Sequence, residues 1–322
     1  MLPVIRLATY NLRFDSRPDN KSVQQSIAEL PHPLQEPLYH AQSGEQPWSI
    51  RRLRIAQQIL NYDIHIIGLQ EALTRQVLDI AELLGSDWAW IGVGRKDGKT
   101  SGEFNPVFYK TSELELIHHD SFWLSETPFE PSKYPGAGHE RVCTMGHFSL
   151  KSLHGASNFT LLNTHLDHRS DAQRRFSASL LLARAKYEAH TTGGAVFIVG
   201  DFNSPSTGRD SGAYRTVVGE LAPMQVSSQL TAKYAVPDDV YADFVMRDVR
   251  EATPQERISG NFATFTGFKK PGNTAGYARI DFVFGGSNGG WNAISYDAPS
   301  VLSDDGILAS DHRPVIVQLS LI

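Results

Sequence analysis

Short apolar runs recur along the chain and end at polar or glycine-containing turns. Runs of this length, rich in Val, Ile, Leu and Phe, predict β-strands. The run at 63–72 is interpreted as a strand that leads into a turn or the start of a helix. The predicted strands cover residues 1–12, 63–72, 88–94, 104–110, 114–124, 144–152, 159–167, 195–202, 279–286 and 314–322.

Helical spacing of apolar residues is found in fewer places than strand patterns. Residues 49–62 predict a helix with Ser49 as its N-cap, residues 171–190 predict the longest helix, and residues 210–221 predict a shorter one. Many predicted strands follow one another with no helix between them. This order favours an α/β protein of the α+β type with largely antiparallel sheets. A Rossmann-like parallel fold is the alternative, but its glycine fingerprint is missing after the first strand.

A proline-containing segment at about 16–48 interrupts the early strand pattern. We interpret it as a loop insertion with a helical turn, because no repeat, low-complexity tract or Gly/Ser linker divides the chain. We therefore expect residues 1–322 to form a single domain.

Composition describes an ordinary soluble globular protein, with 41% hydrophobic residues, 20% charged residues and a net charge of −5. That charge gives no general footprint for nucleic acid. A single cysteine, Cys143, excludes an intrachain disulfide. No signal peptide or membrane-spanning run is recognisable, so we expect a monomeric, cytoplasmic protein, with secretion left open if a leader has been removed.

Polar residues suited to binding metal and phosphate stand where the predicted strands start or end. Each has an ordinary explanation on its own: Asn11 can cap a turn, Glu71 can cap a following helix, and Asp201 with Asn203 can form an Asx turn. Asp281 is harder to explain in this way, because a carboxylate inside an apolar strand needs a partner. The full set is Asn11, Glu71, His165, Asp201, Asn203, Asp281, Asp311 and His312.

One chemistry uses all of these residues. Glu71, Asp311 and the amide oxygen of Asn11 are oxygen ligands of the kind that Mg²⁺ or Mn²⁺ prefers. The sequence contains neither a thiolate cluster nor an HExxH pattern, so it gives no indication of a zinc site. Hydrolysis of a phosphate ester also needs a group that activates water and donors for the phosphate oxygens.

The remaining polar residues match those needs. Asp201 is suited to orient or deprotonate water, and Asn203 and His165 are suited to donate hydrogen bonds. A protonated His312 held by Asp281 is suited to stabilise developing charge. A serine nucleophile has little support, because no G-x-S-x-G motif is present.

These motifs, in this order, resemble those of the endonuclease/exonuclease/phosphatase superfamily, also called DNase I-like. The matching stretches are TYNLRFD, GLQEA, NTHLDH, GDFNSPS, RIDFVF and SDHRPV. The resemblance implies a four-layer α/β sandwich of two central mixed sheets flanked by helices, and a Mg²⁺- or Mn²⁺-dependent phosphoesterase. GDFNSPS and SDHRPV look most similar to the deadenylase-like and sphingomyelinase-like branches.

The resemblance also implies roles. Asn11, Glu71 and Asp311 would serve the metal, His165 would contact the scissile phosphate, and Asp201 would be the acid/base beside Asn203. Asp281 would orient His312. Further stretches resemble a poorly defined branch and add a second tier of substrate-binding candidates. A hairpin turn is an equal alternative for Glu103 and Asn105, and a surface ion pair is an equal alternative for Arg141. These candidates are Glu103, Asn105, Arg141, Asp167 and Arg169.

The function expected from these observations is hydrolysis of a phosphate ester in a small molecule, a sugar phosphate or a lipid headgroup. A nuclease acting on RNA or DNA is the alternative, kept open by Arg95, Lys96, Lys99 and Arg169, which we interpret mainly as solvated surface residues. A noncatalytic binding module is disfavoured, because no motif position has been lost. The sequence does not distinguish a monoesterase from a diesterase, or one metal ion from two.

Overall fold

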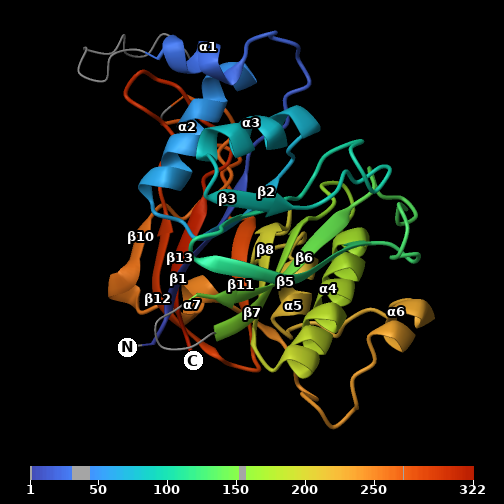
Figure 1. The fold of residues 1–322 in the computed structure, drawn as a ribbon. Coiled ribbons are helices and arrows are strands. Elements are labelled where there is room, and N and C mark those ends of the chain that lie inside the picture. Colours follow the sequence, from blue (N-terminus) through green and yellow to red (C-terminus); the bar gives the residue numbers. More distant parts are fainter. Residues whose placement is uncertain (1, 31–43, 152–156, 271) are drawn as a thin grey trace.

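Two β-sheets pack face to face at the centre of the molecule (Figure 1). The structure is a computed structural model that describes residues 2–30, 44–151, 157–270 and 272–322. The seven-stranded sheet has the order β10-β12-β13-β1-β2-β4-β3, and the six-stranded sheet has the order β5-β6-β7-β8-β11-β9. The strands are β1 (Val4–Asn11), β2 (Ile66–Gln70), β3 (Trp88–Ile91), β4 (Val107–Lys110), β5 (Leu114–Trp123), β6 (Val142–Leu150), β7 (Ser157–His165), β8 (Ala195–Asp201), β9 (Met246–Asp248), β10 (Ile258–Gly260), β11 (Asp281–Gly286), β12 (Trp291–Ala298) and β13 (Val315–Leu321).

Both sheets are mixed and mostly antiparallel. Only β1–β2, β10–β12 and β7–β8 pair in parallel among the described strands. The two ends of the chain meet in one sheet, where Val4 to Thr9 of β1 pair with residues 315–320 of β13. This arrangement confirms the predicted fold class.

Helices cover the outer face of each sheet. Buried side chains of α2 (Trp48–Asn61) and α3 (Thr74–Leu84) pack on the seven-stranded sheet, and those of α4 (Asp171–Thr192) and α5 (Gly212–Val217) pack on the six-stranded sheet. The result is four layers, helix, sheet, sheet, helix. The remaining short helices are α1 (Val23–Ala28), α6 (Ser228–Lys233), α7 (Val249–Ala252) and a 3₁₀ turn at Gln255–Arg257.

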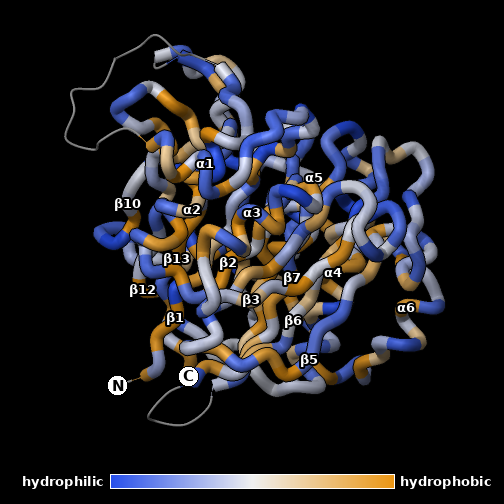
Figure 2. Tube along the Cα trace, turned by 45° about the horizontal axis from the view of Figure 1, so that its top comes forward, coloured by the Kyte–Doolittle hydropathy of each residue, from blue (hydrophilic) through white to orange (hydrophobic). Residues whose placement is uncertain are grey.

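The core between the sheets is almost entirely apolar. Leu7, Phe148, Phe197 and Val317 are fully buried there, and Figure 2 shows hydrophobic residues concentrated along the strands, with hydrophilic residues in the loops. Removal of this apolar surface from water is the main favourable contribution to folding.

Asn163 is a polar exception inside this core. Its Nδ2 donates to the backbone oxygens of Leu69 and Pro106, both at 2.9 Å, and its Oδ1 accepts from Gln70 Nε2 at 2.7 Å. A Cβ on Gly68 would lie 2.5 Å from that oxygen. Asn163 therefore links β7 to the facing sheet, and glycine is needed at 68 for the close approach.

Several elements differ from the sequence-based expectation. Ser49 is not an N-cap, because α2 begins at Trp48 with Pro47 before it. The pattern between 210 and 221 yields only α5, and β12 was not predicted. Within the expected insertion at 16–48, α1 is present, and residues 31–43 lie outside the described part of the chain. Of the helices that the structure describes, none combines the length and the apolar character required to cross a membrane.

Candidate active site

The polar residues singled out in the sequence converge at one edge of the two sheets. Strands β1 and β2 are parallel, as are β7 and β8, so within each pair the carboxyl ends lie together. Strands β11 and β13 run antiparallel to β8 and β1, so they begin where those strands end. The residues positioned in this way are Asn11, Glu71, His165, Asp201, Asn203, Asp281, Asp311 and His312.

Asp201, at the end of β8, lies at the centre of this group and is only 1% exposed. Its Oδ2 accepts from Asn11 Nδ2 at 3.0 Å and lies 3.6 Å from Nε2 of both His165 and His312. Its Oδ1 accepts from the backbone N of Asn203 at 2.9 Å, so the Asx turn foreseen for this pair is also present. Burial and the charge of Asp281 raise the pKa of Asp201 to about 7.

Asp281 and His312 form a buried ion pair. Asp281 Oδ2 lies 2.9 Å from His312 Nδ1, and the ring of Phe265 packs edge-on against the imidazole. Burial by itself would lower the pKa of His312, but the charges of Asp281 and Asp201 raise it well above the ordinary value. The imidazole is therefore held protonated, with its Nε2 toward Asp201.

His165, at the end of β7, is in the opposite state. Asn203 Nδ2 donates to the backbone oxygen of Leu166 at 3.1 Å and lies 3.0 Å from His165 Nε2. Because an amide N–H can only donate, His165 Nε2 is the acceptor and the ring proton is on Nδ1. Burial and the nearby charges of Arg141 and Arg95 lower the pKa of His165 well below its usual value. His165 is thus a neutral donor.

Glu71 takes part in the site and does not cap a helix. The helix that follows, α3, begins at Thr74 with Leu73 before it. Glu71 has a left-handed backbone, with φ at 61°, which is uncommon outside glycine. Its carboxylate accepts from Asn11 Nδ2 at 3.0 Å and from the backbone N of Phe14 at 3.1 Å. The cap interpretation of Glu71 is wrong.

Asn11 presents its amide nitrogen, not its oxygen, to these carboxylates. Asn11 Oδ1 accepts from the backbone N of Arg13 at 2.9 Å, so the turn-capping interpretation also describes one end of this side chain. The side-chain amide of Asn11 must therefore rotate before its oxygen can bind a metal ion.

The donor set suits a hard divalent cation. Ligand atoms of Glu71, His165 and Asp201 lie within 4.8 Å of one another, and those of Asp201, Asp281 and His312 form a second such cluster. Asp311 is in neither cluster, but burial and the charge of Glu71 raise its pKa, so the two carboxylates repel each other. A divalent cation bound between Glu71 and the buried Asp311 would relieve this repulsion.

The second-tier candidates have different surroundings. Asn105 donates from Nδ2 to the backbone oxygen of Val142 at 2.7 Å, and Asp167 accepts from the backbone N of Gly138, Arg169 and Ser170. Glu103 Oε2 lies 4.0 Å from His165 Nδ1. The side chain of Arg169 is exposed.

Two arginines behave differently from the sequence-based expectation. Arg141 is 3% exposed, so the surface ion pair considered for it is wrong. Arg95 was interpreted as a solvated surface residue and is 6% exposed, with Nη1 donating to Glu103 Oε2 at 2.7 Å. No local pattern distinguishes it from its exposed neighbour Lys96.

Ser310 is a further residue whose role was not predicted, although the SDHRPV motif contains it. Its Oγ donates to the backbone oxygen of Asn11 at 2.7 Å and accepts from the backbone N of His312 at 3.2 Å. Ser310 thus joins the end of β1 to the segment that leads into β13.

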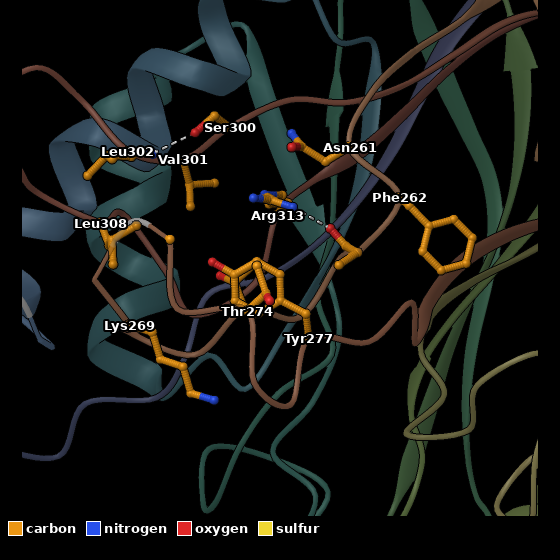
Figure 3. A pocket seen from close by; sticks show the side chains of 13 residues that line it. Asn261, Phe262, Lys269, Thr274, Tyr277, Ser300, Val301, Leu302, Leu308 and Arg313 are labelled. Carbon is orange, nitrogen blue, oxygen red and sulfur yellow. Dashed lines mark hydrogen bonds between the residues drawn. The ribbon is translucent and has the colours of Figure 1, made fainter.

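A separate pocket of about 550 Å³ lies behind the entrance to β13 (Figure 3). Arg313, the neighbour of His312, packs against Tyr277 there, 5.6 Å from its ring centroid. Thr266, also in the wall, donates from its backbone N to the backbone oxygen of Asp311 at 2.8 Å. None of the eight converging residues lines this pocket, although Arg313 directly follows His312 in the sequence.

A two-sheet α/β sandwich with carboxylates and histidines gathered at one edge is the architecture of DNase I-like enzymes. The chain belongs to the Endonuclease/Exonuclease/phosphatase family, whose model matches residues 8–312. Members of this superfamily are hydrolases that act on phosphate esters. The search of curated proteins found no match.

Solved structures agree with this assignment. The chain is 28% identical to an endonuclease/exonuclease/phosphatase from Bacteroides vulgatus, with a TM-score of 0.73 and with 99% of this chain and 100% of that one covered. It is 26% identical to a mannosyl-6-phosphatase from Bacteroides thetaiotaomicron, with a TM-score of 0.71 and coverage of 98% and 100%. A likeness in fold alone extends to TDP2 from D. rerio, complexed with a single-strand DNA product, at 13% identity, a TM-score of 0.59 and coverage of 98% and 99%.

Proposed function

We propose that the protein hydrolyses a phosphate ester with the help of a divalent cation, by in-line attack of water. The observation that carries this proposal is the position of Asp201. This buried carboxylate lies 3.6 Å from one protonated and one neutral imidazole and accepts a hydrogen bond from Asn11. Such a centre places an acid/base group beside donors for a charged phosphoryl group.

Glu71 and Asp311, with the amide oxygen of Asn11, would hold Mg²⁺ or Mn²⁺. The cation would supply Lewis-acid polarisation of a phosphate oxygen. This ligand set remains a prediction, supported by the repulsion between Glu71 and the buried Asp311 and by the preference of carboxylates for hard cations.

The protein side chains would divide the remaining work. Asp201 orients the water and accepts its proton while the water oxygen bonds to phosphorus and the ester P–O bond breaks. His165 Nδ1 stabilises a non-bridging oxygen, and Asn203 holds the His165 ring in the required tautomer through its bond to Nε2. His312, kept protonated by Asp281, stabilises the negative charge that develops in the transition state.

A small-molecule substrate, a sugar phosphate or a lipid headgroup, agrees best with the observations. The relative from Bacteroides thetaiotaomicron named above acts on a sugar phosphate according to its name, and the net charge of −5 disfavours long nucleic acid. Nuclease activity is the second candidate, favoured by the exposed cations Lys96, Lys99 and Arg169 near the site. We also propose that residues 1–322 act as one domain, since β1 and β13 are neighbours in one sheet.

The test is a panel of substrates at fixed salt concentration with Mg²⁺. It compares hexose 6-phosphates, phospholipid headgroup esters and single-stranded oligonucleotides. We expect turnover of the small esters. Strong oligonucleotide cleavage with a steep dependence on salt would instead support the nuclease alternative.

A further inference from the structure

Two buried arginines, Arg95 and Arg141, carry hydrogen-bond donors that the proposed roles do not use, and together with His165 they are called the arginine wall here. Arg95 and Arg141 are 6% and 3% exposed. His165, whose pKa is lowered by the charges of both arginines, is 6% exposed. Among the described residues, the Nε atoms of both arginines and Nδ1 of His165 have no hydrogen-bond partner. An unpartnered buried donor is destabilising, and an anionic ligand that accepts from it removes this cost.

Glu103 is the counter-ion of Arg95: its Oε2 accepts from Arg95 Nη1 at 2.7 Å and lies 4.0 Å from His165 Nδ1, so the Nε atom of Arg95 and Nδ1 of His165 stay without a hydrogen bond. Arg141 Nη2 forms a hydrogen bond with His168 Nδ1 at 3.3 Å. Its distance to Asp167 Oδ1, 3.7 Å, is longer than a hydrogen bond. That carboxylate already accepts three backbone N–H groups. Burial and the charge of Arg95 both lower the pKa of Arg141.

Rigid elements hold both arginines in place. Arg95 is in a tight loop where its backbone N donates to Glu103 O at 3.0 Å and its backbone O accepts from Trp123 Nε1 at 2.7 Å. Arg141 directly precedes β6, and its backbone O accepts from Leu124 N at 2.8 Å. These contacts fix the backbone of both arginines, which limits the positions that their side chains can reach.

We propose that Arg95, Arg141 and His165 Nδ1 bind the non-bridging oxygens of a terminal phosphoryl group and thereby make the protein select phosphate monoesters over diesters. This inference rests on the proposed phosphoesterase function and names its substrate class. A monoester dianion presents three charged, unsubstituted oxygens, and arginine matches such oxygens with two parallel N–H groups. In a diester one of these oxygens carries a second substituent, so a diester offers one charged oxygen fewer to these donors.

The experiment compares p-nitrophenyl phosphate with methyl p-nitrophenyl phosphate, two substrates with the same leaving group. Wild type should prefer the monoester. Arg141→Met should lower kcat/KM for the monoester by about 10²- to 10³-fold, the loss seen when one donor to a transition-state oxyanion is removed, and should change the diester by less than about threefold. Lys96→Met, which removes an exposed charge from the Arg95 loop, is the matched control and should match wild type.

A second readout does not depend on turnover. Calorimetry in Mg²⁺ should detect binding of inorganic phosphate to wild type and to Lys96→Met, and binding at least tenfold weaker to Arg141→Met. Arg141→Lys and Arg95→Lys, which keep the charge but lose the planar fork, should show intermediate losses and serve if Arg141→Met does not fold.

The outcomes separate the two proposals. Equal losses on both esters, or phosphate binding that is unchanged in every arginine variant, would overturn the monoester inference while the phosphoesterase function stands. If wild type hydrolyses neither these esters nor the substrate panel, the proposed function fails, and calorimetry still decides whether the arginine wall binds phosphate.

Discussion

Replacement of Asp281 by Asn is the perturbation whose effect follows most directly from the structure. Asn has nearly the same volume and keeps an acceptor for His312 Nδ1, which lies 2.9 Å from Asp281 Oδ2. The change removes only the negative charge. The side chains of Asp281 and His312 are 0% and 4% exposed, so solvent screens this charge little.

The expected magnitude follows from the strength of the pair. A hydrogen bond to a charged group contributes about 1.5–3 kcal/mol, against about 0.5–1.5 kcal/mol between neutral groups. The direct attraction of two charges about 4 Å apart adds at most roughly 4 kcal/mol at an effective dielectric constant of 20. A combined loss of about 2–4 kcal/mol of imidazolium stabilisation, at 1.36 kcal/mol per tenfold change, lowers kcat by roughly 30- to 1,000-fold.

The assay is kcat for p-nitrophenyl phosphate in saturating Mg²⁺, with circular dichroism melts to show that the variant is folded. Asp238→Asn, at an exposed position, removes an equal charge and should match wild type. A folded Asp281→Asn variant with kcat within about threefold of wild type would refute the role assigned to the Asp281–His312 pair.

Two further predictions concern stability. Despite burial, hydrogen bonds from Arg17 and backbone N–H groups lower the pKa of Asp15 to about 2, so this carboxylate stabilises the fold above about pH 4 and the contribution is lost as the pH falls toward 2. Asp15→Asn should therefore destabilise by about 1–2 kcal/mol at pH 7 and by much less at pH 2.5, measured by urea denaturation; an equal effect at both pH values would contradict this. The two carboxylate oxygens of Asp248 each lie 2.7 Å from Nη2 of the buried Arg279. Asp248→Asn removes this charge and should lower the free energy of unfolding by about 3–5 kcal/mol. A loss below about 1 kcal/mol would contradict the pairing.

The convergence of these polar residues at one edge was predictable from the sequence because its determinants are local. Asp201 and His165 each follow an apolar run at once, and an apolar run of that length is a buried strand whose end is fixed to within a residue or two. Strand ends that lie at the same edge of a sheet then bring such residues together. The closing segment around His312 was recognisable for the same reason, because it directly precedes the last strand.

What the sequence did not predict depends on contacts between distant segments. Arg95 and Lys96 are adjacent cations in one loop. Arg95 is buried and bonded to Glu103 and Trp123, whereas Lys96 is exposed. Asn163 alternates with His165 on the same strand, but it is used to join the two sheets. Burial of a charged residue is decided by tertiary packing, which periodicity does not encode.

The central claim is that the carboxylates at this edge hold a divalent cation required for hydrolysis of a phosphate ester. The most direct test is the rate of p-nitrophenyl phosphate hydrolysis by EDTA-treated protein, before and after addition of Mg²⁺ or Mn²⁺, with Glu71→Gln measured in parallel. We predict no turnover in chelator, recovery on addition of either metal, and recovery in Glu71→Gln only at much higher metal concentration. Turnover in EDTA equal to that in Mg²⁺ would contradict the account.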